Sequence, residues 1–399
     1  MATLFLALIY ATFISLGLPD SLLGVSWPVM QPGLGVPYSF AGIISMIVSG
    51  GTIVASFFSG PIIRRFGTGN TTRVSVAMTA IALCGFSLSP SFGWLLLMAI
   101  PLGLGGGAVD AALNHFVATH YKANHMNWLH CFWGVGAMSG PLIMSRFIVE
   151  GGNWRGGYLT VGIIQGCLVA LLLASLPLWR WTERETSSAR PALAPAGQQQ
   201  PTRNAGRDNG RHAQDGNAIL DDGGSAEKGN AGLLSVLKLP GVWPVLVAFF
   251  SYCGAEATMG LWGSSFLVKA RGLDASTAAF WVSLFFGSLT VGRLISGFAA
   301  MRTSNASLIR AGLLLILAGA GLMLLPMPGP FSPVGFLLVG LGCAPIYPSM
   351  LHETPRRFSA DWAPMLMAYR WGSHIQALPF CPRHSGSSPP AGTWLSSPQ

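Results

Sequence analysis

Charged residues are scarce in this chain. Only 9% of its 399 residues are Asp, Glu, Lys or Arg, and 51% are hydrophobic, whereas soluble domains carry about 25% charged residues. This composition excludes an ordinary soluble domain and indicates an integral membrane protein. The net charge of +9 comes without a basic helix or arm, so no nucleic-acid partner is expected.

Motifs of enzymes and metalloproteins are also lacking. The six cysteines are scattered without a CxxC pair or a Cys/His cluster, so neither a metal site nor a disulfide framework is predicted. No Ser/His/Asp constellation or metalloprotease motif is present. The run Gly103–Ala108 loosely matches a dinucleotide fingerprint, but it lies in an apolar stretch with no preceding strand. We therefore predict that the chain is not an enzyme and binds no cofactor.

What the chain has instead is long apolar runs. A helix that spans a membrane takes about 20 apolar residues. Ten runs clearly reach this length, and an eleventh, 362–380, is weaker because it contains Arg370 and His374. The ten clearer runs cover approximately residues 4–30, 39–63, 72–90, 93–119, 127–149, 156–179, 241–268, 275–300, 305–326 and 333–352. The predicted fold class is an all-α integral membrane protein with about 11 spans.

Basic residues alternate between the loops. Arg64 and Arg65 follow the second run and several Arg residues follow the sixth, whereas the loops after the first, third and ninth runs contain no Lys or Arg. The loops after the fifth and seventh runs contain Arg155, Lys269 and Arg271. Because positive loops stay in the cytoplasm, we expect a cytoplasmic N-terminus. The protein is predicted to lie in the cytoplasmic membrane as a multi-pass chain.

A polar stretch divides the chain. Residues 182–232 are rich in Gly, Ala, Asn, Gln and Arg and contain nothing that could form a core, which is typical of a disordered linker. We expect a six-helix bundle in residues 1–181 and an incomplete second bundle in residues 233–380. Residues 381–399 form a polar tail that looks foreign to the rest.

The two sides of the linker form an internal repeat. Asp20 and Gly24 match Glu256 and Gly260 at an offset of 236 residues (256 − 20 = 236), and Gly103 matches Gly340 at 237 (340 − 103 = 237). An even number of spans separates the copies, so they share one orientation. This is the pattern of parallel repeats related by an axis along the membrane normal.

The repeat also predicts spans near residues 364–386 and 393–416. The chain instead continues from Cys381 as a polar segment to Gln399. One interpretation is that the natural C-terminus has been replaced, for instance by a frameshift, with loss of a twelfth span; the other is a genuine eleven-span protein. The reading frame around codon 380 distinguishes them.

Three carboxylates interrupt the apolar runs: Asp20, Asp110 and Glu256. Insertion of a charge at mid-membrane costs about 2.5–3.5 kcal/mol, so such residues usually serve function. A carboxylate in a partly dry cavity can load and release protons near neutral pH. The repeat partner of Asp110 is Tyr347 (347 − 110 = 237), which is neutral near pH 7. We therefore predict Asp110 as the leading proton carrier, with Asp20 and Glu256 assisting; the alternative is a polar residue held against a neighbouring helix.

Other polar and aromatic residues are candidate solute contacts. Asn114 lies four residues after Asp110, and His130 lies three after Asn127, so each pair shares a helix face. Amides donate and accept hydrogen bonds, which suits hydroxyl groups, although bonding between helices explains them equally well. Tyr347 and Trp262 complete this set. Flat aromatic rings, with Trp27, Trp128, Trp133 and Trp281 alongside Trp262, suit a sugar face or else simple packing.

These segments together resemble the fucose/galactose/glucose:proton symporter family of the major facilitator superfamily. The resemblance is carried by Gly17–Asp20, Gly103–Phe116, Met126–His130, Tyr252–Glu256 and Gly292–Gly297. It implies two six-helix bundles around a cavity lined by spans 1, 4, 7 and 10. It also implies that acidic residues of spans 1 and 4, here Asp20 and Asp110, serve binding and proton coupling, and that Asn127 is the polar residue that opens span 5.

The chain departs from that family at two positions. Asp110 stands where the fucose permease branch has Glu, so a shorter reach is expected, and Arg64 stands where the superfamily motif usually has Asp. The sequence predicts proton-coupled transport of a small polar solute, a monosaccharide, by a monomer in a lipid bilayer. The alternatives are a drug or metabolite proton antiporter of the same fold and a truncated remnant that does not transport.

Overall fold

The computed structural model describes residues 2–121, 123–175, 179, 241–325 and 331–350. All regular elements in this part of the chain are helices, so the predicted all-α fold is confirmed. The predicted eleventh span, the linker 182–232 and the tail 381–399 lie outside the described residues. The junctions between the predicted domains lie there too.

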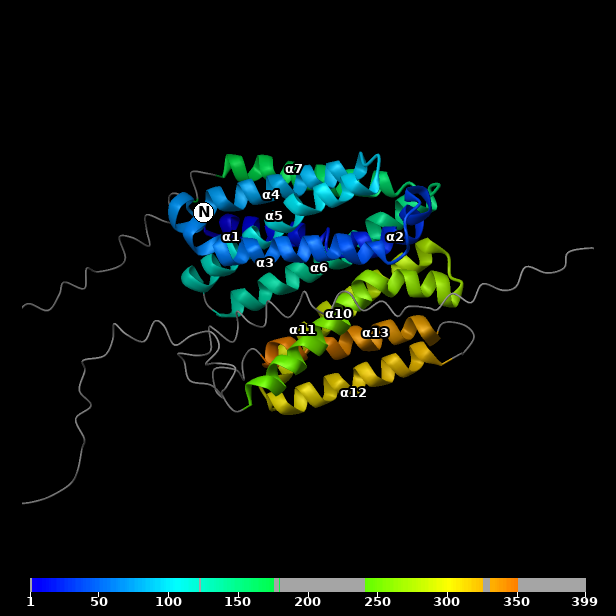
Figure 1. Cartoon of the computed structure of the whole chain (residues 1–399). Coiled ribbons are helices and arrows are strands. Elements are labelled where there is room, and N and C mark those ends of the chain that lie inside the picture. The colour runs from blue at the N-terminus through cyan, green and yellow to red at the C-terminus, as the bar shows by residue number, and fades with distance from the viewer. Residues whose placement is uncertain (1, 122, 176–178, 180–240, 326–330, 351–399) are drawn as a thin grey trace, which may run out of the picture.

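Within the described residues, eleven helices form two bundles (Figure 1). Nine segments among the described residues are long and apolar enough to cross a membrane, and α4 packs between α5 and α7 beside them. The first bundle contains α1 (Ala2–Gly17), α2 (Leu22–Leu34), α3 (Phe40–Phe66), α4 (Thr68–Ser87), α5 (Phe92–His120), α6 (Ala123–Val149) and α7 (Trp154–Ala174). The second contains α10 (Val242–Arg271), α11 (Ala275–Ala299), α12 (Asn305–Leu324) and α13 (Phe331–Cys343).

Polar caps begin several of these helices. The side chains of Asn153 and Asp274 accept hydrogen bonds from the backbone N–H groups of Gly156 and Thr277, at 3.0 and 2.9 Å. Such bonds satisfy donors that the first helical turn leaves free. The Asp274 carboxylate also accepts from Ser276, and these bonds lower its pKa to about 2. These two side chains thus fix where α7 and α11 start.

The first predicted span, residues 4–30, is divided between α1 and α2. Residues 18–21 form turns between α1 and α2, and Asp20 lies in this break. Pro19 explains the break, because proline lacks a backbone N–H and disfavours helical geometry in the residue before it. The tenth span is interrupted in the same way at Ala344 and Pro345, just before Tyr347.

The two bundles meet at the end of the molecule far from the N-terminus (Figure 1). A Cβ atom on Gly24 of α2 would lie 2.1 Å from the carbonyl oxygen of Gly260 of α10. These glycines are partners in the repeat, so the axis that relates the copies passes close to their contact. Hydrogen bonds join the bundles at this end, from Tyr38 to Ser265 at 2.8 Å, from Ser145 to the carbonyl of Ser276 at 3.0 Å and from Ser283 to the carbonyl of Met138 at 2.8 Å.

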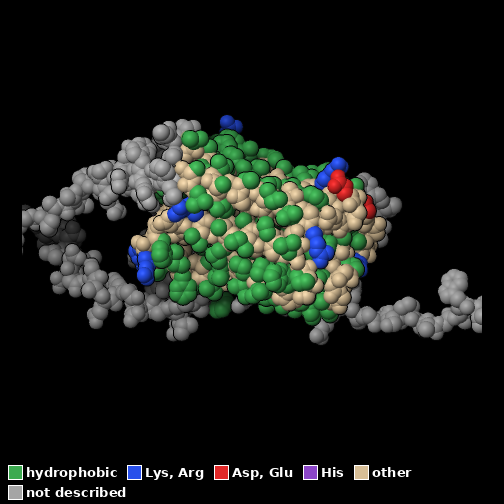
Figure 2. Space-filling view, turned by 90° about the horizontal axis from the view of Figure 1, so that it is seen from above, with side chains coloured by type: hydrophobic (Ala, Val, Ile, Leu, Met, Phe, Trp, Pro, Cys, Tyr) green, Lys and Arg blue, Asp and Glu red, His purple; other side chains and the backbone are tan. Residues whose placement is uncertain are grey.

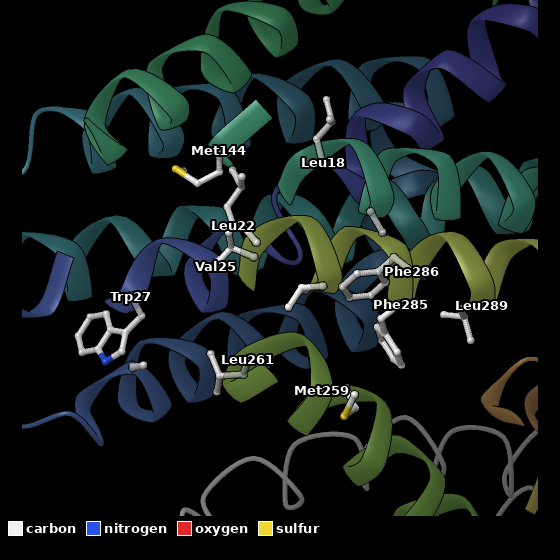
Figure 3. Packing of buried hydrophobic residues seen from close by; sticks show 14 of the residues in the cluster. Leu18, Leu22, Val25, Trp27, Met144, Met259, Leu261, Phe285, Phe286 and Leu289 are labelled. Carbon is white, nitrogen blue, oxygen red and sulfur yellow. The ribbon is translucent and has the colours of Figure 1, made fainter. Parts of the chain in front are cut away.

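Buried apolar side chains from both bundles form one cluster at this junction (Figure 3). Leu22 and Val25 of α2, Met144 of α6, Leu261 of α10 and Phe286 of α11 all belong to it. Outside the core, many large apolar side chains are exposed, and Figure 2 shows a largely hydrophobic face with Lys and Arg toward its margins. An exposed apolar surface of this extent suits lipid rather than water.

Candidate functional site

The two bundles enclose a cavity of about 370 Å³. This volume lies within the range of small-molecule sites, about 300–1,000 Å³. Asp20, Asp110 and Glu256 all line the cavity although they come from three separate segments of the chain. The structure thus brings the three predicted carboxylates around one space.

Asp20 occupies the break between α1 and α2, and its carboxylate is exposed to the cavity. The indole Nε1–H of Trp133, on α6, donates a hydrogen bond to its Oδ2 at 2.7 Å. Hydrogen bonds to ionised acceptors are short and roughly twice as strong as neutral ones. This bond therefore orients the side chain of Asp20 in the turn between the two helices.

Glu256 has a cationic partner. Arg293 Nη2 lies 3.7 Å from Glu256 Oε1, and both side chains are only 12% exposed. The Tyr252 hydroxyl donates to Glu256 Oε2 and accepts from Arg293 Nη2 at 3.4 Å. Glu256, Tyr252 and Arg293, on α10 and α11 of the second bundle, thus form a polar cluster in which each side chain contacts the other two.

Trp133 connects this group to the first bundle. The guanidinium carbon of Arg293 lies 5.3 Å from the centroid of the Trp133 ring, a distance at which a cation is attracted by the aromatic face. Because the same indole donates to Asp20, one side chain contacts a carboxylate of the first bundle and the cation of the second. Asp20 and Glu256 are therefore linked through Trp133 and Arg293 across the interface between the bundles.

Asp110 and Asn114 do share a helix face, as predicted. Asn114 Nδ2 donates to Asp110 Oδ1 at 2.9 Å. Asp110 lines the cavity, while Asn114 is not among the lining residues. The amide of Asn114 therefore holds Asp110 by a hydrogen bond without itself lining the cavity. Among the described residues, no Lys or Arg forms an ion pair with Asp110 or Asp20.

The remaining candidates fall in different places. His130 and Tyr347 both line the cavity, with ring centroids 6.5 Å apart. Asn127 lies on α6, but its side chain is outside the described residues. Trp262 is not a lining residue; it packs near Tyr38 at the junction of the bundles, with ring centroids 6.3 Å apart. The structure thus places Trp262 in the packing between bundles rather than at the cavity wall.

Sequence reasoning missed Arg293 as a site residue and named Trp133 only among several tryptophans that suit a sugar face or simple packing. Arg293 is a single cation within the apolar run 275–300, so the argument applied to the acids would have found it. Trp133 lies three residues after His130, on the same helix face. Within the described residues, no group of three or more His, Cys, Asp or Glu side chains could hold a metal ion.

Comparisons with known proteins identify the fold and a family. Residues 6–371 match the Major Facilitator Superfamily. The yeast Saccharomyces cerevisiae protein named Bypass of stop codon protein 6 is 23% identical over 293 residues, which are 73% of this chain and 56% of that protein. The glucose/mannose transporter GlcP of Bacillus subtilis is 24% identical over 147 residues, 36% of each chain. The chain thus matches about half or less of these relatives' own length.

Solved structures share the same fold. The xylose transporter XylE from E. coli, in an inward-open conformation, superposes with a TM-score of 0.69 at 12% identity, covering 95% of this chain and 88% of that one. A peptide transporter POT in complex with sulfate gives a TM-score of 0.67 at 15% identity, covering 93% and 86%. At such low identity these likenesses establish the architecture alone.

Proposed function

Because the chain belongs to the Major Facilitator Superfamily, we propose that it carries a monosaccharide together with protons across the cytoplasmic membrane. The observation that carries this proposal is the charge content of the cavity. Three carboxylates line it, and Arg293 is the only Lys or Arg among the described lining residues. Two carboxylates therefore face the cavity without a cation of their own.

The carboxylates of Asp20 and Asp110 are suited to bind protons. An unpaired ionised carboxylate is costly inside a membrane, and the cost falls sharply once the group binds a proton. Asp110 is held by a neutral amide and Asp20 by a neutral indole. We infer that Asp110 is the leading proton carrier, with Asp20 assisting. Glu256 is neutralised by Arg293 and helps to form the cavity.

The chemistry around the carboxylates suits a sugar. Hydroxyl groups can bond to carboxylate oxygens, while Tyr252, Tyr347 and His130 supply flat rings with polar edges at the cavity wall. Ser45 and Ser49 of α3 line the same space. GlcP, named as a glucose/mannose transporter, and XylE, named as a xylose transporter, support a monosaccharide as the solute class.

Transport would proceed by rocking of the two bundles about this fixed site. The end far from the N-terminus is closed, and the distribution of Lys and Arg in the loops supports a cytoplasmic N-terminus. The structure would then correspond to a state closed toward the outside. Opening that end must separate Tyr38 from Ser265 and Ser145 from the backbone of Ser276.

The test is uptake into proteoliposomes under an imposed pH gradient, with radiolabelled glucose, xylose, galactose and fucose in separate samples. We expect at least one sugar to accumulate against its gradient and to lose accumulation when the pH gradient is collapsed. A lipophilic cation such as tetraphenylphosphonium serves as the competing solute class. Proton flux with that cation, and none with any sugar, would replace sugar symport by drug-type exchange.

A further inference from the structure

The cavity is not confined to the space between the bundles. Its lining includes Thr79 and Phe86 of α4 and Tyr158 and Gln165 of α7, and both helices belong to the first bundle. Each of these four side chains is at most 3% exposed. We call this inner part the N-bundle recess and define it by Thr79, Phe86, Leu102, Gly106, Tyr158 and Gln165.

Gly106 keeps the recess open toward the carboxylates. Leu102, Gly106 and Asp110 follow one another at intervals of four residues on α5 and all line the cavity, so they form one stripe on that helix. A Cβ atom on Gly106 would find only Leu16 Cδ1 within 4 Å, at 3.9 Å. Gly106 therefore lies at the mouth of the recess, about one helical turn of 5.4 Å from Asp110.

The neighbouring glycines have a different purpose. A Cβ atom on Gly105 would lie 2.6 Å from the Ser75 carbonyl oxygen, and one on Gly107 would lie 2.4 Å from that of Thr52. Those two glycines let α4 and α3 pack closely on α5. Gly106 is not needed for such packing, so the space beside it is available to a ligand.

The recess is mostly apolar with one unused acceptor at its inner wall. Phe86 and Leu102 provide apolar surface, and the Tyr158 hydroxyl is engaged with Ser26 at 3.2 Å. Gln165 Nε2 donates to the Ser15 carbonyl at 2.8 Å, but Gln165 Oε1 is buried without a hydrogen-bond partner. Buried polar atoms are nearly always bonded, so this oxygen calls for a donor from a bound molecule.

We propose that the N-bundle recess binds an apolar arm of the solute, so that the preferred solute is a glycoside rather than a free sugar. The sugar head lies beside Asp110 and Trp133. An uncharged flat substituent passes Gly106, lies against Leu102, and donates a hydrogen bond to Gln165 Oε1. This proposal rests on the proposed transport of a monosaccharide and specifies the class of derivative.

Binding to the full chain in lipid nanodiscs tests this directly. Isothermal titration with the methyl β-glycosides of glucose, xylose, galactose and fucose first identifies the sugar that binds. The methyl, phenyl and 4-hydroxyphenyl β-glycosides of that sugar are then compared. We expect the phenyl compound to bind roughly tenfold or more tightly than the methyl compound, from burial of the ring. The 4-hydroxyl should add about fivefold through its hydrogen bond.

Three variants test whether the apolar arm of the solute binds in the N-bundle recess. Gly106→Leu should bring the phenyl and methyl glycosides to nearly equal affinity, whereas Gly106→Ala, which fits the space, should keep the gain from the phenyl ring. Gln165→Met should remove only the further gain from the 4-hydroxyl. A phenyl glycoside no tighter than the methyl one in the unmodified chain overturns the proposal, as does a phenyl gain that persists in Gly106→Leu. Failure of every methyl glycoside to bind would instead refute the sugar assignment itself.

Discussion

Asp20 and Glu256 occupy equivalent positions in the two copies of the repeat, yet the structure surrounds them differently. Asp20 lies in an unwound turn, open to the cavity and bound by one neutral donor. Glu256 lies within the continuous helix α10, 12% exposed and beside Arg293. One copy of the repeat therefore presents a carboxylate that solvent and protons can reach, and the other holds its carboxylate in a charge pair.

A single neighbouring residue accounts for the backbone difference. Pro19 precedes Asp20, and Ala255 precedes Glu256. Proline breaks the helix, whereas alanine is the best helix former. This difference supports the proposed division of roles, with proton exchange in the first bundle and fixed charge in the second. Each of the following changes tests this division.

Removal of Arg293 should have the largest effect on stability. Arg293→Leu leaves Glu256 buried without its cation, which costs about 3–5 kcal/mol for buried pairs. The double variant Arg293→Leu/Glu256→Leu should recover most of this loss because no unpaired charge remains. Thermal unfolding in nanodiscs measures both.

The matched control is Arg146→Leu. Arg146 and Glu150 are closer, at 3.0 Å, but their side chains are 75% and 53% exposed. Exposed pairs contribute roughly 0–1 kcal/mol, so this variant should unfold almost like the unmodified chain. Equal losses for Arg146→Leu and Arg293→Leu would contradict a buried charge pair in the second bundle.

A smaller effect is expected for Trp133→Phe. This change removes the N–H that donates to Asp20 but keeps an aromatic ring near Arg293. A hydrogen bond to a charged group contributes about 1.5–3 kcal/mol, so we expect solute affinity to fall by about tenfold or more. Trp128→Phe is the control, since Trp128 lies on the same helix and is 48% exposed. Equal affinities in the two variants would remove Trp133 from the site.

The sequence was sufficient for the fold and for the carboxylates. Apolar runs and the repeat of Gly24 in Gly260 can be read from the sequence, and the structure bears out the helical spans. The contact between these two glycines was not predicted and comes from the structure. The break at Pro19 was not predicted, although proline lacks the backbone N–H that a continuous helix uses.

The contacts between the bundles could not be predicted from the sequence. Trp133 and Trp262 look alike as tryptophans within apolar spans, but the first bonds to Asp20 and the second packs at the closed end. Nothing in their local sequence distinguishes them, because the difference arises from how α6 and α10 face the opposite bundle. The N-bundle recess likewise requires the exact approach of α4 and α7 to α5.

The most direct test of the account is the effect of Asp110→Asn on two modes of transport. In proteoliposomes, the variant should lose sugar accumulation driven by a pH gradient while it keeps counterflow exchange of sugar, because exchange needs no net proton movement. Glu150→Gln, which changes an exposed acid outside the cavity, should keep both. Undiminished pH-driven accumulation in Asp110→Asn would contradict the assignment of proton exchange to the first bundle.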